Sequence, residues 1–171
     1  MNNLGKKIGL GLLVVLVVIQ FIRPVKNQDA NVSDKDISKV VQVPDNVSSI
    51  LKKACNDCHS NYTVYPWYSN IQPVYFWLDH HIDEGKHHLN FSEFGTYSAF
   101  RQYRKLAEVA EQIEECEMPI SSYTLIHKNA VLSADEKKII VDWAKANSES
   151  ILKSIPPDVL EQEKAKRRKR Q

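Results

Sequence analysis

The chain of 171 residues has only five glycines, seven prolines and three cysteines. Scarcity of both helix-breaking residues favours helices, so we expect an all-α fold. An odd number of cysteines does not suggest a disulfide framework. A four-cysteine zinc site is excluded as well, because the C-x-x-C sequence that begins at Cys55 has no second copy. The length suffices for one domain with a hydrophobic core and short appendages.

The body of the chain has no excess of basic over acidic residues. Residues 164–170 carry six positive charges and no negative one, although the whole chain has a net charge of only +2. The remainder is therefore mildly acidic, which argues against a nucleic-acid-binding domain and against nucleic acid as a partner. We expect residues 156–171 to be a basic, disordered tail.

Long apolar runs are also scarce, and the one present spans residues 8–22, interrupted only by Gln20. Lys6 and Lys7 precede it, which is the pattern of an export signal. The run is shorter than the roughly 20 residues that cross a bilayer, yet no A-x-A cleavage site follows. We expect residues 1–23 to be an uncleaved signal anchor forming a single membrane helix, with a cleaved signal peptide as the alternative. The polar residues 24–42 then predict a flexible tether.

One motif organises the rest of the chain, Cys55-Asn56-Asp57-Cys58-His59. C-x-x-C-H is the attachment signature of a c-type haem. Its two thiols add to the vinyl groups of one haem edge, and the histidine becomes the fifth ligand of the iron. Because such haem is attached outside the bacterial inner membrane, the motif agrees with an export signal. It predicts a domain anchored to the inner membrane and located in the periplasm.

The residues before the motif predict a helix that carries both thiols. Apolar side chains recur at helical spacing from Val47 to Cys58. Asp45 is the expected N-cap, and the helix should end near His59. A thioredoxin-like C-x-x-C would instead follow a strand. The ring nitrogen of His59 that faces away from iron needs an acceptor, for which the carbonyl of Pro66 or Pro73 is our candidate.

The sixth ligand is predicted to be Met118, the one methionine besides the initiator. An amphipathic helix begins near Ser98 and ends before Met118-Pro119, since proline prevents its continuation. Met118 then lies in a loop far enough from His59 to reach the opposite face of the haem. Histidine and methionine together raise the potential and suit electron transfer. Cys116, two residues earlier, is expected to be a small buried residue or a half-exposed thiol, with an intermolecular disulfide or competition with Met118 for the iron as alternatives.

Several other residues are weaker candidates. Trp67 lies in an aromatic segment that could form part of the haem pocket, and Tyr123 and His127 could bind the haem propionates. Four histidines, at positions 80, 81, 87 and 88, lack the H-x-x-x-H spacing of a metal site. We interpret them chiefly as a solvated helix face.

A last helix is predicted to close the domain. Ser133 and Glu136 form a capping box, and Ile139, Ile140 and Trp143 give the helix a buried face. Pro156-Pro157 should end it, so the haem-binding domain is expected to span residues 43–155.

With these motifs the chain resembles the cytochrome c-type haem-binding domain family, small monohaem domains of exported bacterial proteins. The resemblance covers roughly residues 43–147 and rests on Cys55-x-x-Cys58-His59, Pro66-Trp67-Tyr68, Leu89-Asn90-Phe91-Ser92, Met118-Pro119, Tyr123, His127 and the closing helix. It implies cytochrome c-like helices around one covalent haem c, with His59 and Met118 as axial ligands.

The function predicted from the sequence is single-electron transfer without enzymatic activity, to redox partners that the sequence does not name. Two alternatives stay open. One is a haem-based sensor or peroxidase with a labile Met118. The other is a thiol-disulfide oxidoreductase that uses Cys55 and Cys58 without haem.

Overall fold

A computed structural model describes residues 3–168, and this part of the chain consists of helices and connecting segments without a β-strand. The expected all-α fold is therefore confirmed for the described residues. The α-helices are α1 (Asn3–Ile19), α2 (Asp45–Ala54), α3 (Asn56–His59), α4 (Val74–His88), α5 (Ala99–Glu114), α6 (Ser121–Ile126), α7 (Ala134–Ser154) and α8 (Pro157–Arg168). Short 3-10 turns add η1 (Ile37–Lys39), η2 (Trp67–Asn70), η3 (Phe91–Thr96) and η4 (Lys128–Ala130).

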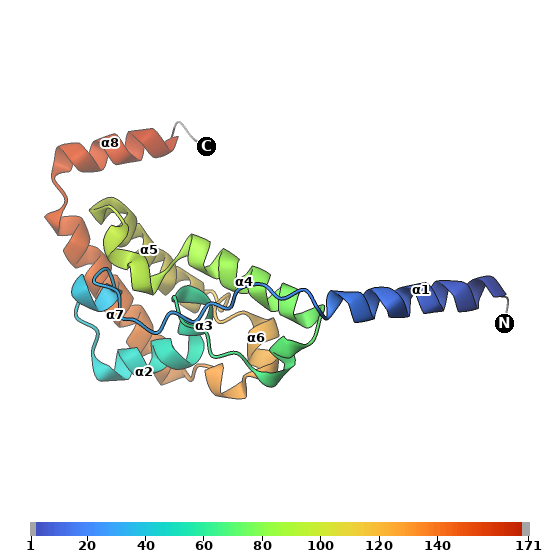
Figure 1. Ribbon diagram of the computed structural model, residues 1–171. Coiled ribbons are helices and arrows are strands. Elements are labelled where there is room, and N and C mark those ends of the chain that lie inside the picture. The colour runs from blue at the N-terminus through green and yellow to red at the C-terminus, as the bar shows by residue number, and fades with distance from the viewer. Residues whose placement is uncertain (1–2, 169–171) are drawn as a thin grey trace.

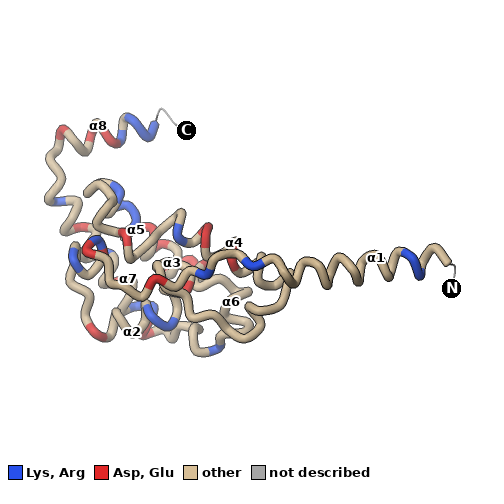
Figure 2. The backbone as a smooth tube through the Cα atoms, in the orientation of Figure 1, with Lys and Arg blue, Asp and Glu red and all other residues tan. Residues whose placement is uncertain are grey.

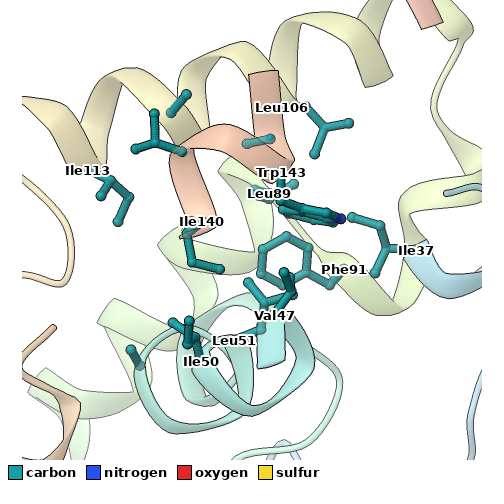
Figure 3. Packing of buried hydrophobic residues seen from close by; sticks show 14 of the residues in the cluster. Ile37, Val47, Ile50, Leu51, Leu89, Phe91, Leu106, Ile113, Ile140 and Trp143 are labelled. Carbon is teal, nitrogen blue, oxygen red and sulfur yellow. The ribbon is translucent and has the colours of Figure 1, made fainter. Parts of the chain in front are cut away.

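The hydrophobic core lies between α5, α7 and α2, with α5 and α7 forming the most extensive helix pair. Figure 3 shows Leu106 and Ile113 of α5 facing Ile140 and Trp143 of α7, with side chains of α2 below them. Burial of such apolar surface contributes roughly 25 cal/mol per Å². The apolar faces of α5 and α7 thus pack against each other and form one side of the helical bundle.

The helix starts follow local sequence signals. Ser98 accepts a hydrogen bond from the Arg101 N–H and caps α5. The predicted capping box is present at α7, where Ser133 and Glu136 bond each other's backbone N–H. Asp45, expected as the N-cap of α2, is instead its first helical residue, where its carboxylate favours the positive end of the helix dipole.

The expected flexible tether of residues 24–42 is wrong, because this segment is strapped along the domain. Asn27 donates its side-chain amide to the Ser60 carbonyl and Thr63 Oγ1, both at 2.9 Å. Gln28 forms an isolated bridge with Tyr62. Ile37 is buried in the core, and the Trp143 indole donates to the Gln42 carbonyl at 2.9 Å. The polar composition of this segment therefore does not indicate a free linker, because the side-chain amide of Asn27 and backbone groups of the segment bond to the domain.

The two terminal helices lie apart from the bundle (Figure 1). None of the described helices is both long enough and apolar enough to span a bilayer, so the expected membrane helix is not found among them. Lys6 and Lys7 are the only charged residues in α1, as Figure 2 shows. Residues 157–168, expected to be disordered, form α8 with no buried residue. Positions 169–171 of the predicted tail and 1–2 of the predicted signal lie outside the described residues.

Candidate functional site

The C-x-x-C-H motif sits at a break between two helices rather than inside one. Cys55 has φ −125° and ψ −42°, so it ends α2 and starts the short α3. The Cys55 carbonyl accepts from the His59 N–H at 2.9 Å, which closes one helical turn around the motif. The expected continuous helix is thus wrong in detail, but the turn still brings both sulfurs and the imidazole to one cavity.

His59 is fixed by the carboxyl end of α4. Its Nδ1 lies 3.0 Å from the Gly85 carbonyl and 3.0 Å from the Leu89 carbonyl. Both partners are acceptors, so Nδ1 carries the proton and Nε2 keeps its lone pair. Burial lowers the pKa of His59, although the two carbonyls oppose this effect. The neutral ring therefore presents an unprotonated nitrogen, as a metal ligand must.

The acceptors are not the Pro66 or Pro73 carbonyls that we expected. Those two residues precede η2 and α4, whereas the last turn of α4 supplies the acceptors. The Leu89 carbonyl lies just beyond the last helical residue, where carbonyls lack intrahelical partners, whereas the Gly85 carbonyl also accepts the Leu89 N–H at 2.9 Å. This end of α4 is where α3 packs, so it supplies the bond that a ligating histidine needs.

Gly85 allows α4 to approach the motif this closely. A Cβ atom at this position would lie 2.6 Å from the Cys58 carbonyl oxygen and 3.0 Å from the Cys58 Cβ. Glycine in a helix interior costs roughly 1 kcal/mol relative to alanine. The close contact with backbone explains why a glycine interrupts this histidine-rich helix.

A cavity of about 460 Å³ opens beside the motif and is walled mainly by apolar groups. This volume falls within the roughly 300–1,000 Å³ of small-molecule and cofactor sites. Its wall includes Cys55, Cys58, His59, Met118 and Tyr123, so the cavity gathers five of the seven predicted site residues. The other two, Trp67 and His127, do not line it.

The two thiols line this cavity and are shielded from bulk water. Burial, with the neighbouring Cys58, raises the pKa of Cys55 to about 12. Burial, with the charge of Asp57, raises the pKa of Cys58 to about 11. Reactive cysteines have lowered pKa values instead. The pair is therefore poorly suited to thiol-disulfide exchange at neutral pH.

Met118 reaches the cavity through the way in which α5 ends. The Glu117 N–H bonds the Gln112 carbonyl at 3.0 Å and the Cys116 N–H bonds the Ile113 carbonyl at 3.2 Å. With Cys116 at φ 61°, this is a Schellman termination. Thus α5 stops before Pro119 is reached, and the reversed chain brings half-buried Met118 back against the core.

Tyr123 is held by the motif itself. Its hydroxyl donates to Asp57 Oδ2 at 2.7 Å, and burial together with this bond raises its pKa. The Tyr123 ring stacks on His127 at a centroid distance of 4.2 Å. His127 Nε2 in turn lies 2.6 Å from the Tyr68 hydroxyl. Trp67 is 77% exposed and does not line the cavity, so it does not occupy the pocket position that the sequence predicted.

The histidine cluster falls mainly on the surface of α4, as expected. Within residues 3–168 no group of three or more His, Cys, Asp or Glu side chains could hold a metal ion. His81 and His88 nevertheless reach the edge of the cavity, because they share the Gly85 face of the helix. Exposed Cys116 lies 3.2 Å from Lys137 Nζ and outside the cavity wall.

Sequence reasoning missed three residues at the site. Asp57 ties the motif to Tyr123 and also accepts from the Val64 N–H at 3.0 Å. Gly85 provides the close approach, and Lys105 lines the cavity. Only Gly85 had a visible signal, since a lone glycine within a helical stretch indicates a packing constraint.

The chemistry of this donor set fits a haem. It combines two thiols one helical turn apart, an imidazole with a free nitrogen, a thioether and a cavity with apolar walls. A dithiol enzyme would not need the last three. His59 and Met118 would hold the iron, and Cys55 and Cys58 the macrocycle edge.

Comparison with known proteins agrees with this fit. The family of haem-binding domains matches residues 14–146. That match starts earlier than the resemblance noted in the sequence, and it includes the segment strapped along the domain. No curated protein and no solved structure matches the chain. Because most of its length matches, the chain belongs to the haem-binding domain family.

Proposed function

We propose that the chain is a monohaem c-type cytochrome domain that carries single electrons. Cys55 and Cys58 would hold the haem covalently, with His59 and Met118 as its axial ligands. The observation that carries the proposal is the state of His59. Its Nδ1 is committed to two carbonyls, which leaves Nε2 as a lone-pair donor at an apolar cavity.

The haem supplies one-electron chemistry when bound, and this chain's residues tune it. The Gly85 and Leu89 carbonyls fix the His59 tautomer and raise its basicity as a ligand. The thioether of Met118 favours the reduced iron and raises the potential. Apolar walls limit water around the site. If His59 and Met118 both bound the iron, no position would stay open for a substrate, which would favour a carrier over an enzyme.

The first test is covalent attachment in the full chain, expressed with a cytochrome c maturation system. We expect a low-spin reduced spectrum, and haem that stays with the chain on a denaturing gel and through acid-acetone extraction. Cys55→Ala combined with Cys58→Ala should abolish the bound colour. Cys116→Ala is the matched control and should keep it, because that thiol is exposed and outside the cavity. A colourless wild-type chain, or haem that extracts freely, overturns the proposal.

Two alternatives are tested by the same preparation. A sensor or peroxidase with a labile Met118 would bind carbon monoxide rapidly in the ferrous state, whereas a carrier would bind it slowly. A haem-free dithiol enzyme would show rapid alkylation of Cys55 and Cys58 at neutral pH. The raised pKa values of both thiols speak against the second alternative.

We also propose that the domain is exported, with the apolar residues of α1 acting as the export signal. Every described residue of α1 up to Val18 is exposed, so the helix takes no part in the core. Fractionation of cells that produce the full chain tests this, with the haem-stained band expected outside the cytoplasm. Carbonate extraction of the membrane fraction then decides whether the chain stays attached to the inner membrane. A band confined to the cytoplasm contradicts export.

A further inference from the structure

The cavity wall is mainly apolar, and most of its charged or titratable side chains other than those of the motif come from α4 and α5. At the edge between these two helices, His81, Glu84 and His88 come from α4, and Lys105 and Glu108 from α5. Lys105 is the only Lys or Arg in the wall among the described residues. Its side chain is only 19% exposed, far less than is usual for lysine, so most of it lies inside the protein.

Lys105 is held at this edge by an ion pair with an acidic residue of its own helix. Lys105 Nζ is 2.6 Å from Glu108 Oε2, and Glu108 Oε1 is 2.5 Å from Arg104. One carboxylate is thus shared by two cations. Because Arg104 also neutralises Glu108, Lys105 can pair with a second anion and leave Glu108 with a cationic partner.

The residues that the sequence suggested for the haem propionates are already engaged. Tyr123 donates its hydroxyl to Asp57, and His127 bonds the Tyr68 hydroxyl. His81 Nδ1 lies 2.8 Å from the Trp77 carbonyl and so carries its proton there. When neutral, His81 offers the cavity only an acceptor. These engagements leave Lys105 as the permanently charged donor on the described wall.

We propose that Lys105 binds a haem propionate and thereby helps to set the reduction potential. The inference rests on the proposed function, since it needs a haem in the cavity. Haem carries its two propionates at the edge opposite the vinyl groups, so they point away from Cys55 and Cys58. A carboxylate at a partly buried edge needs a charged partner. The cation beside it also favours the oxidation state with the lower positive charge, which is the ferrous one.

The test compares two neighbouring substitutions in the full haem-loaded chain. Lys105→Gln removes the cation in the wall, and Arg104→Gln removes the cation that shares Glu108 but does not line the cavity. Both lose one positive charge and one bond to the same carboxylate. We expect a lower reduction potential in Lys105→Gln and a much smaller shift in Arg104→Gln. Equal shifts, or none, overturn the proposal.

A pH profile separates propionate binding from a general effect of charge. A propionate paired with Lys105 stays ionised, so its own titration should not appear in the potential near neutral pH. In Lys105→Gln the propionate pKa should rise, and the potential should gain a pH-dependent segment that Arg104→Gln lacks. Identical profiles for the two variants count against the proposal.

Two further variants keep the test decisive if Lys105→Gln accumulates poorly. Lys105→Arg keeps the charge and should stay close to the wild-type potential, so a shift as large as that of a charge-removing variant contradicts the proposal. Glu108→Gln removes an anion from the same edge and should raise the potential; a fall contradicts it. Haem content on a denaturing gel is measured throughout. Wild-type chain without covalent haem refutes the proposed function, whereas normal haem with unaltered potentials refutes only the role of Lys105.

Discussion

The two walls of the cavity that carry the proposed iron ligands, His59 and Met118, are built differently. On the His59 side, backbone packs on backbone, because α4 lies against the motif at Gly85 and two carbonyls hold the imidazole. On the Met118 side, the chain reverses direction in a Schellman turn, and the half-buried Met118 side chain projects from the loop that follows. The first wall specifies orientation through fixed hydrogen bonds. The second specifies only position, so we expect its ligand to be the more replaceable one.

The largest expected effect is on the His59 wall. His59→Ala removes the nitrogen that both carbonyls orient, so we expect complete loss of the low-spin spectrum. Optical spectra of the ferrous and ferric protein measure it. His80→Ala is the control, because His80 is exposed and outside the cavity wall. A wild-type spectrum in His59→Ala would mean that another residue ligates the iron.

Met118→Ala should be milder and different in kind. We expect covalent haem to remain, the potential to fall, and carbon monoxide to bind the ferrous form rapidly. Loss of a half-buried methionine should also cost about 1–2 kcal/mol, less than full burial would. Ile120→Ala is the matched control, since Ile120 lines the same cavity and cannot ligate iron. If both variants keep the wild-type potential, Met118 is not the ligand.

Gly85→Ala tests the close packing of the His59 wall. The new Cβ would overlap the Cys58 carbonyl, and such overpacking costs about 1–3 kcal/mol. Alanine regains roughly 1 kcal/mol of helix propensity, so we expect a net loss of stability of up to about 2 kcal/mol. Denaturant unfolding measures this loss, and spectra report any tilt of His59. Gly11→Ala meets nothing within 4 Å and should not destabilise the protein.

Tyr123→Phe breaks the bond between α6 and the motif. A hydrogen bond to a carboxylate is worth about 1.5–3 kcal/mol when buried, and less at this partly exposed site, so we expect a loss of about 1–2 kcal/mol. The change in unfolding free energy should exceed that of Tyr62→Phe, whose side chain is exposed. Similar values for both would show that the Asp57 bond contributes little.

The smallest effect concerns the turn before Met118. Cys116 occupies the left-handed region at φ 61°, which glycine adopts without strain. Cys116→Gly should therefore stabilise the protein by up to about 1 kcal/mol. Cys116→Ala keeps the strain and should bring no such gain. An equal gain in both would point to the exposed thiol instead of the backbone.

The residues that local chemistry dictates were predictable from the sequence. Ser133 and Glu136 form their capping box, Ser98 starts α5, and Cys55, Cys58, His59, Met118 and Tyr123 meet at one cavity. Each prediction depended on contacts within a few residues or on a motif with a fixed chemical purpose.

What the sequence could not provide depends on contacts between distant segments. The acceptors of His59 lie 26 and 30 residues away, in a helix whose packing angle no local pattern specifies. The segment 24–42 was misjudged because amino-acid composition does not distinguish an asparagine in a free linker from one that, like Asn27, is hydrogen-bonded to the domain. Lys105 was not predicted as a site residue, since helical periodicity cannot reveal that a lysine side chain lines a cavity.

The strap has a mechanical consequence. A free linker of that length would let its ends separate by about 5–6 Å times the square root of the residue number, a cloud of positions over 20 Å wide. Here Gln20 and Arg23 are bonded to the Gln72 and Asn70 backbone, and Asn27 is clasped by Ser60 and Thr63. The segment that joins α1 to the domain is thus fixed to the domain and is not a flexible linker. A surface that bound α1 would therefore also fix the direction in which the cavity faces.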